Sequence, residues 1–245
     1  MKRLLFLLLL IPLCVEAKIP DAEDIAKQTL NPASPFYYPN LMMRYQSGDN
    51  TLTNDDYHYL YYGYAHQDSY KPLEPNPALD RLLLTAATMD ADHPDRQIME
   101  RIISTATETL KRDPFSPKVL NLLAYAYGAL GNKEKEAVTY EQLKRILYTI
   151  EESGDGLTQK TPRHILMFDH AIDLLASYDL TTSKSQIVSR EIEYIPLLTP
   201  QVIVGKKIRG YYFDYSRIYR NKPDGYVFKR ARTWQFNNLR PREYK

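Results

Sequence analysis

Between residues 21 and 150 the chain repeats one local pattern, and this pattern constrains the fold more than any other feature. A residue that caps helices, or a proline suited to a first helical turn, precedes each segment with helically spaced apolar residues. These starts are Asp21, Pro39, Thr53, Asn76-Pro77, His93-Pro94-Asp95, Ser116-Pro117 and Asn132. The pattern predicts helices over most of residues 21–150, and in His93-Pro94-Asp95 it predicts that proline occupies the first helical position.

The segment after Thr53 shows the pattern most clearly. Asp56 follows Thr53 at the third position, as in a weak capping box. One helical face of the segment consists of Tyr57, Leu60, Tyr61 and Tyr64. Alternation of tyrosines would fit a strand equally well, but the capping signal and the length of the segment favour a helix.

After residue 150 the pattern changes to shorter segments rich in β-branched and aromatic residues. Residues 187–195 and 207–215 are typical of strands, residues 164–168 suggest a short strand, and residues 169–178 favour a helix. We therefore predict an α+β fold. Its N-terminal two-thirds are mainly helical, and a small antiparallel sheet lies near the C-terminus, within residues 163–228.

The first seventeen residues have the organisation of a cleaved export signal. Lys2 and Arg3 precede an apolar stretch of about twelve residues, which is too short to span a bilayer, and Val15-Glu16-Ala17 is a small-residue cleavage pattern. We expect cleavage after Ala17 and a periplasmic or extracellular location. A lipoprotein anchored through Cys14 is the less favoured alternative, because Leu13 replaces the small residue that should precede the cysteine.

We divide the chain into a signal peptide (1–17), a single α+β domain (18–228, helical over 21–150 and mixed with antiparallel strands over 163–228) and a basic C-terminal tail (229–245). Cys14 is the single cysteine of the sequence, so cleavage would exclude disulfides and thiolate chemistry. Residues 206–245 carry a net charge of +9, while residues 18–205 carry −8. A solvated hairpin over Lys206–Tyr226 with a loose terminus would account for these charges.

The basic tail is also a candidate for contact with an anionic surface. The predicted contact residues are Lys229, Arg230, Arg232 and Trp234. Cations interleaved with aromatic side chains suit an anionic membrane or an acidic polysaccharide. We expect no nucleic-acid partner, because an exported protein rarely meets nucleic acid.

Residues 120–137 resemble one degenerate tetratricopeptide helix pair. The matching residues are Leu120, Leu123, Ala124, Tyr127, Gly131 and Ala137. The resemblance implies an antiparallel helical hairpin. We expect its core positions to be Leu120, Leu123, Tyr127, Ala137 and Leu147. No second copy follows at a spacing of 34 residues, as a tetratricopeptide array would require.

An ordered series of short motifs resembles a family of exported proteins from Bacteroidota, domain of unknown function 4919. The motifs are Ser34-Pro35-Phe36-Tyr37-Tyr38-Pro39 with Leu41 and Arg44-Tyr45, Gly48-Asp49 before Leu52-Thr53, Tyr57-x-x-Leu60-Tyr61-Tyr62-Gly63, Ser153-Gly154-Asp155-Gly156 and Tyr212-Phe213-Asp214-Tyr215. The likeness spans roughly residues 20–220, and Pro162–His170 is less typical of the family. It implies export and architecture but supplies no activity.

The residues that could carry catalysis form no recognised local motif. The pairs His58/His66 and His164/His170 lack the i, i+4 spacing of helical zinc ligands, so we expect no metal site. The sequence contains neither the nucleophile elbow nor the glycine-rich phosphate loops, and we expect no cofactor. Five carboxylates lie close together in the sequence: Glu151, Glu152, Asp155, Asp169 and Asp173. The sequence does not determine the distances between them in the folded protein.

Two classes of function follow. The predicted ligand-binding residues are Tyr57, Tyr61, Tyr62, Tyr64, Ser153 and Asp155. The leading hypothesis is a non-enzymatic helical adaptor that binds a protein or peptide of the cell envelope. The alternative is an envelope hydrolase that acts on a sugar or peptide in a cleft lined by tyrosines and carboxylates. Core packing would also account for most of these tyrosines.

Overall fold

The computed structural model describes residues 17–90, 92–203 and 205–222. The first part of the chain is helical. It consists of α1 (Ala22–Thr29), α2 (Tyr38–Gln46), α3 (Asn54–Gly63), the 3-10 helix η1 (Tyr64–His66), α4 (Pro77–Ala87), α5 (Arg96–Leu110), α6 (Pro117–Ala129) and α7 (Lys133–Glu151). These are followed by β1 (Arg163–His164), α8 (Phe168–Ala176), β2 (Gln186–Ile187), β3 (Ile192–Ile203), β4 (Lys206–Asp214) and α9 (Ser216–Arg220). The predicted α+β class is confirmed.

The helices begin close to the predicted residues. Side-chain caps are provided by Asp21, Thr53, Asp95 and Asn132. The capping box of α3 is complete, with Asp56 bonding back to Thr53. The start of α5 differs from the prediction. Asp95 is its N-cap and accepts a hydrogen bond from the Ile98 N–H at 3.0 Å, so Pro94 precedes the helix instead of occupying its first position.

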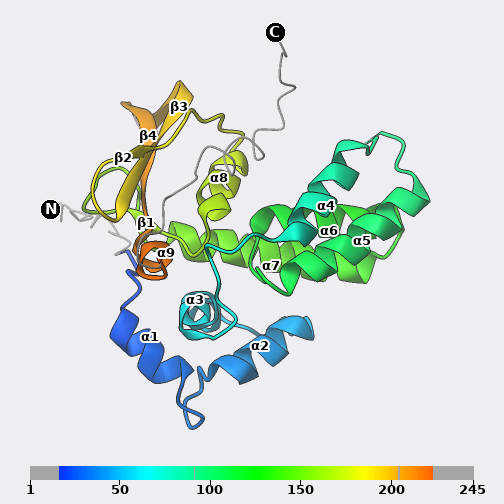
Figure 1. Ribbon diagram of the computed structural model, residues 1–245, viewed down its shortest axis with the longest axis horizontal. Coiled ribbons are helices and arrows are strands. Elements are labelled where there is room, and N and C mark those ends of the chain that lie inside the picture. The colour runs from blue at the N-terminus through cyan, green and yellow to red at the C-terminus, as the bar shows by residue number, and fades with distance from the viewer. Residues whose placement is uncertain (1–16, 91, 204, 223–245) are drawn as a thin grey trace, which may run out of the picture.

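The larger of two hydrophobic cores lies among α1–α3, α7, α8 and the sheet (Figure 1). Its largest fully buried side chains are Tyr61, Tyr62, Tyr64, Tyr215, Phe115 and Phe213. Gly63 lets α1 and α3 approach closely, because a Cβ at this position would lie 2.6 Å from Cγ2 of Thr29. Four of the six largest buried side chains among the described residues are tyrosines, so tyrosine fills core positions that leucine or phenylalanine occupies in most proteins.

Helices α4, α5 and α6 enclose a smaller second core. Its buried members are Leu82, Met99, Ile102, Ala106, Val119, Leu123 and Ala126. With α7, these helices form the right-hand part of Figure 1. The spacing of Met99, Ile102 and Ala106 places one continuous stripe of α5 against its neighbours.

Helices α6 and α7 pack side by side and are joined by residues 130–132. Of the residues that suggested a tetratricopeptide pair, Leu120, Leu123 and Ala124 are buried, and Tyr127 is half-buried. Ala137 is exposed, contrary to the prediction. The buried positions of α7 include Thr139 and Leu143, and a residue two positions before Thr139 lies on the opposite side of a helix.

The sheet is small and mixed, with the strand order β1-β4-β3-β2. Strands β2, β3 and β4 are antiparallel, as predicted, whereas β1 pairs with β4 in parallel through Arg163 and His164. The parallel pair is a departure from the predicted antiparallel sheet. It arises because α8 and the following loop carry the chain across before β3 begins.

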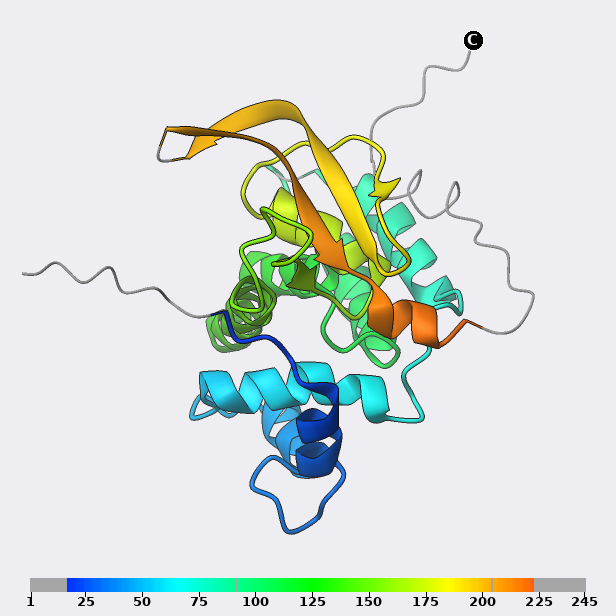
Figure 2. The ribbon, with the colours of Figure 1, turned by 90° about the vertical axis from the view of Figure 1, so that its left-hand side faces the viewer.

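The longest strands, β3 and β4, form a hairpin that turns between Ile203 and Lys206. Four residues, 197–200, lie opposite one residue of β4, so the hairpin is interrupted by a bulge. Beyond this bulge, the ends of β3 and β4 extend away from the helices (Figure 2). The hairpin therefore consists of Ile192–Ile203 and Lys206–Asp214, with its turn before Lys206, instead of beginning at Lys206, and α9 follows β4.

Candidate functional site

The four tyrosines predicted to bind a ligand lie inside the larger core. None of Tyr57, Tyr61, Tyr62 and Tyr64 exposes more than 4% of its surface. Burial is the main cause that raises the pKa of each phenol, to about 12 for Tyr57 and Tyr64, so all four are protonated at neutral pH. The hydroxyls of Tyr61, Tyr62 and Tyr64 form hydrogen bonds with groups of the protein itself. As ligand contacts, all four tyrosines stay a prediction.

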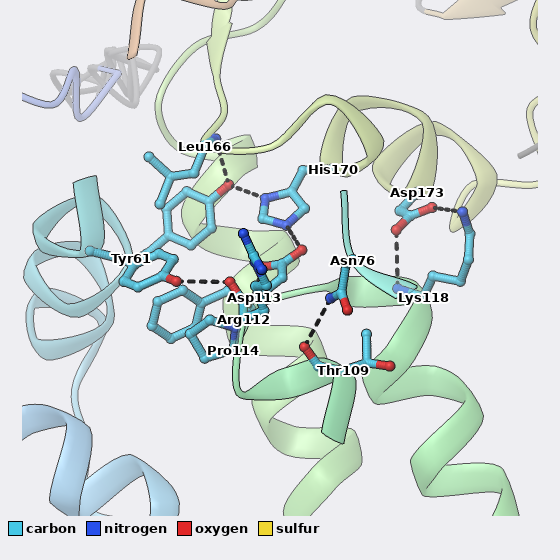
Figure 3. A network of polar contacts seen from close by, with 12 residues as sticks. Tyr61, Asn76, Thr109, Arg112, Asp113, Pro114, Lys118, Leu166, His170 and Asp173 are labelled. Atoms are coloured by element: carbon cyan, nitrogen blue, oxygen red, sulfur yellow. Dashed lines mark hydrogen bonds and ion pairs between the residues drawn. The ribbon is translucent and has the colours of Figure 1, made fainter. Parts of the chain in front are cut away.

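Tyr61 belongs to a buried polar network that joins α3, the loop before α6 and α8 (Figure 3). Its hydroxyl lies 2.7 Å from Nδ1 of His170 and accepts a hydrogen bond from the Leu166 N–H at 3.3 Å. Nε2 of His170 lies 3.1 Å from Oδ2 of Asp113. Tyr61 and His170 are fully buried, whereas the Asp113 side chain is partly exposed.

These contacts assign the protons of the network. Because the Tyr61 oxygen accepts from the Leu166 N–H, its own proton is directed to Nδ1 of His170. Nδ1 is then an acceptor, and Nε2 carries the proton that is donated to Asp113. Both ring nitrogens of His170 are therefore engaged within the protein.

The loop of residues 111–117 is held by aromatic side chains from three directions. Tyr64 donates its hydroxyl proton to the Arg112 carbonyl at 2.8 Å, and Tyr45 donates to the Pro114 carbonyl at 3.1 Å. The Phe115 ring is fully buried between Tyr45, Tyr61 and Tyr64, with ring centroids 5.5–5.7 Å apart. The network thus fixes this loop against α3.

Of the remaining predicted ligand contacts, Ser153 is buried and Asp155 is exposed. The Ser153 hydroxyl donates to the Ile150 carbonyl at 2.6 Å and accepts from the His164 N–H at 2.8 Å. Asp155 accepts from the Leu157 N–H at 2.9 Å. The two side chains therefore shape the turn after α7, and ligand contact at either residue stays a prediction.

Two glycines of this turn have different tasks. Gly156 has a φ of +67°, a left-handed conformation that favours glycine. Gly154 serves a close approach instead, because a Cβ there would lie 2.2 Å from the Pro162 carbonyl oxygen. The turn can thus bring β1 next to the end of α7.

A second buried polar cluster lies beside the end of α7. The Arg217 guanidinium donates to Nδ1 of His164 at 3.3 Å and lies 5.1 Å from the centre of the Tyr62 ring. His58 and Glu152 face each other, with Nδ1 and Oε1 4.0 Å apart. Burial lowers the pKa of both His58 and His164 to about 4, and the Arg217 charge acts in the same direction.

We expect the free energy of unfolding to fall as the pH is lowered from about 6.5 to about 4. In the unfolded chain His58 and His164 have pKa values of about 6.5, so the unfolded state binds more protons than the folded state in this window. Stability is therefore present above the unfolded pKa and lost as the pH falls. The loss is on the order of 2 kcal/mol per histidine.

Urea denaturation at pH 7 and at about pH 4.5 measures this effect. The double substitution His58→Asn/His164→Asn should flatten the pH dependence, since asparagine does not titrate. His93→Asn is the matched control, because the His93 side chain is 88% exposed. A pH dependence that the double substitution leaves unchanged would assign the acid sensitivity to other groups.

The outer part of the β3–β4 hairpin carries a different kind of surface. Val202 is 73% exposed and Ile203 is 44% exposed, and both are paired across the hairpin with lysines, Lys207 and Lys206. Arg209 is exposed on the same strand as these lysines. Within the described part of the chain, none of these three cations forms an ion pair.

Comparison with known families identifies the chain. Residues 23–223 match the model of a domain of unknown function, DUF4919. The chain belongs to this family. No curated protein and no solved structure was found to match. The DUF4919 match includes nearly all of the described elements, and it ends before the predicted tail contacts Lys229, Arg230, Arg232 and Trp234, which lie outside the described residues.

Among the residues that the structure describes, no three His, Cys, Asp or Glu side chains form a group that could hold a metal ion. In the same ranges, none of the helices combines the length and the apolar composition needed to cross a bilayer.

Two features of the candidate site in this DUF4919 chain were not predicted from the sequence. The pairing of His170 with Asp113 joins positions 57 residues apart, and local spacing gives no signal for it. The hairpin surface does have a sequence signal, because residues 194–213 contain no aspartate or glutamate. An acid-free stretch with three cations is unusual next to a body of negative charge.

Proposed function

We propose that this protein is an exported protein of the cell envelope that binds a partner protein without catalysing a reaction. The observation that carries the proposal is the outer β3–β4 hairpin, which joins an open strand edge, apolar side chains and unpaired cations in one projecting element. The occupant that fits these properties is an extended, acidic peptide segment of the partner.

The outer edge of β4 offers backbone groups with which an added strand could pair. Strand β1 pairs with β4 only at Phe213 and Asp214, and the next contact is the hydrogen bond from the Tyr212 N–H to the Gly156 carbonyl. Among the described residues, no backbone group pairs with the outer edge of β4 from Lys206 to Arg209. Every second residue of an edge strand directs its N–H and C=O outward, so an added strand could continue the sheet.

Charge also supports the proposal. Lys206, Lys207 and Arg209 line this edge, and the nearest acidic residues in the sequence are Glu193 and Asp214. An acidic peptide on this edge would neutralise these cations. The rest of the chain up to residue 205 is acidic and would repel such a peptide, which confines it to the hairpin.

The alternative, an envelope hydrolase, has less support from the geometry. A general base needs a ring nitrogen directed at the substrate, and both nitrogens of the fully buried His170 are engaged by Tyr61 and Asp113. Asp173, another carboxylate of the predicted cluster, lies 3.0 Å from Nζ of Lys118 and joins α8 to α6. These groups hold elements together.

Fluorescence anisotropy with two labelled decapeptides tests the proposal. One peptide alternates glutamate with valine, and the other alternates lysine with valine. We expect the acidic peptide alone to bind, and the double substitution Lys206→Glu/Lys207→Glu to weaken it at least about tenfold. The control Lys27→Glu/Lys111→Glu changes the same net charge at exposed positions on α1 and after α5, and it should leave the affinity within about twofold.

Two results would overturn this function. Equal weakening by both double substitutions would show that the peptide responds to net charge and not to the hairpin. Binding to vesicles that contain phosphatidylglycerol, lost in Lys206→Glu/Lys207→Glu and without any binding of the acidic peptide, would replace the peptide by an anionic membrane.

A further inference from the structure

We propose that removal of the signal peptide creates a charged group that the fold is built to bind: the new α-ammonium group of Lys18 pairs with the C-terminal end of α7. This inference rests on the export part of the proposed function and is independent of the hairpin. Hydrolysis of the bond between Ala17 and Lys18 consumes one water molecule, leaves a carboxylate on Ala17 and an amine on Lys18. The amine takes up a proton at neutral pH.

The backbone nitrogen of Lys18 already lies at the binding position. It is 2.7 Å from the carbonyl oxygen of Glu152, the C-cap residue of α7. In the uncleaved chain this nitrogen is a neutral amide with one proton to donate. After cleavage it carries a positive charge and three protons.

The end of a long helix is a favourable place for such a charge. Helix α7 spans Lys133–Glu151, and no basic residue lies in its last turn. The partial negative charge of its last carbonyls is therefore not balanced by a side chain of the helix itself. An ammonium group on Lys18 would supply the missing cation.

The side chain of Glu152 gives a second, independent indication. Within the ranges that the structure describes, its buried Oε1 forms no hydrogen bond, and neither does the facing Nδ1 of His58. Burial raises the pKa of Glu152, and the nearby Lys18 charge offsets this rise only in part. The α-ammonium group would form on the residue that is hydrogen-bonded to Glu152 itself.

The charges that face this position come from four elements. They are Asp55 and His58 on α3, Glu152 after α7, Asp24 on α1 and Arg217 on α9. Asp55 is engaged by Nζ of Lys18 at 2.5 Å, and Arg217 donates to the Pro20 carbonyl at 3.0 Å. Residues 18–20 are thus held by α3, α7 and α9 together, which keeps the new terminus in place.

The pairing has a defined pH dependence. A free α-amino group has a pKa of about 7.7–8.0, and pairing with a helix end and a carboxylate raises this pKa in the folded state. The stabilisation is complete below the unfolded pKa and is lost as the pH rises through the raised folded value. It therefore disappears at about pH 10.5.

Two forms of the mature chain test the inference. One begins at Lys18 and the other at Ala17, which displaces the ammonium group by one residue. At pH 7 we expect the form that begins at Lys18 to have a Tm about 2–4 °C higher, and at about pH 10.5 we expect equal values. Lys18→Met in both forms is the control. It removes the ion pair with Asp55 but should preserve the difference between the two forms.

Each of the other possible outcomes contradicts a specific part of this inference. Equal Tm values at pH 7 would contradict the ammonium site. A difference that persists at about pH 10.5 would show that the extra residue disturbs packing, with no role for charge. Mass spectrometry of the native protein should find Lys18 as the first residue, and a different terminus would overturn the link to export while the Tm comparison still tests the site.

Discussion

Replacing Phe115 with alanine is expected to lower the free energy of unfolding by about 3–5 kcal/mol. Phe115 is fully buried, and its ring contacts Tyr45, Tyr61 and Tyr64 in edge or tilted arrangements. Truncation would leave a cavity at the point where the 111–117 loop meets α3. Tyr45 and Tyr64 donate to carbonyls of this loop, so they cannot collapse into the space without breaking hydrogen bonds.

Urea denaturation followed by circular dichroism measures this loss. Phe115→Leu is the matched control, because it keeps most of the apolar volume and should cost less than about 1.5 kcal/mol. A cost below about 1 kcal/mol for Phe115→Ala would show that the loop is not packed against α3 as described.

Replacing His170 with alanine is expected to cost about 2–4 kcal/mol. The imidazole is fully buried, and its removal combines a cavity with the loss of two hydrogen-bond partners. The Tyr61 hydroxyl would keep the Leu166 N–H but lose its own acceptor inside the core. A buried donor without an acceptor accounts for about 1–3 kcal/mol of the expected cost.

A double-mutant cycle with Tyr61→Phe separates the network from simple packing. Removing the hydroxyl together with the imidazole abolishes the unpaired donor, so the double variant should cost less than the sum of the single variants by about 0.5–3 kcal/mol. Additive costs would mean that the 2.7 Å contact between Tyr61 and His170 contributes nothing to stability.

How far the fold follows from the sequence depends on the range of the interactions involved. Caps act over three residues, and Thr53, Asp95 and Asn132 each mark a helix in the structure. The bounds of the strands follow less directly from the sequence, because they depend on pairing with other strands. Residues 187–191 read as part of a strand but mostly form the turn between β2 and β3, and β4 required β3 as its partner.

In the candidate site, too, local patterns follow from the sequence and long-range contacts do not. The spacing of the tyrosines in α3 predicts a helical stripe. Whether this stripe faces a groove or the core depends on α7, α8 and the loop around Phe115. The contact between Tyr61 and His170 joins residues 109 positions apart, and nothing in the sequence links them. By contrast, the exposed lysines of β4 follow from the sequence, because a run without acidic residues cannot neutralise them locally.

We propose the outer β3–β4 hairpin as an edge that binds a peptide. Hydrogen exchange of the backbone amides, measured with and without the alternating glutamate–valine peptide, tests it most directly. An added strand must slow the exchange of outward-facing amides between Lys206 and Arg209, and Lys206→Glu/Lys207→Glu must abolish this protection. Protection confined to α4–α7, or no protection of β4 at a peptide concentration that saturates binding, would contradict it.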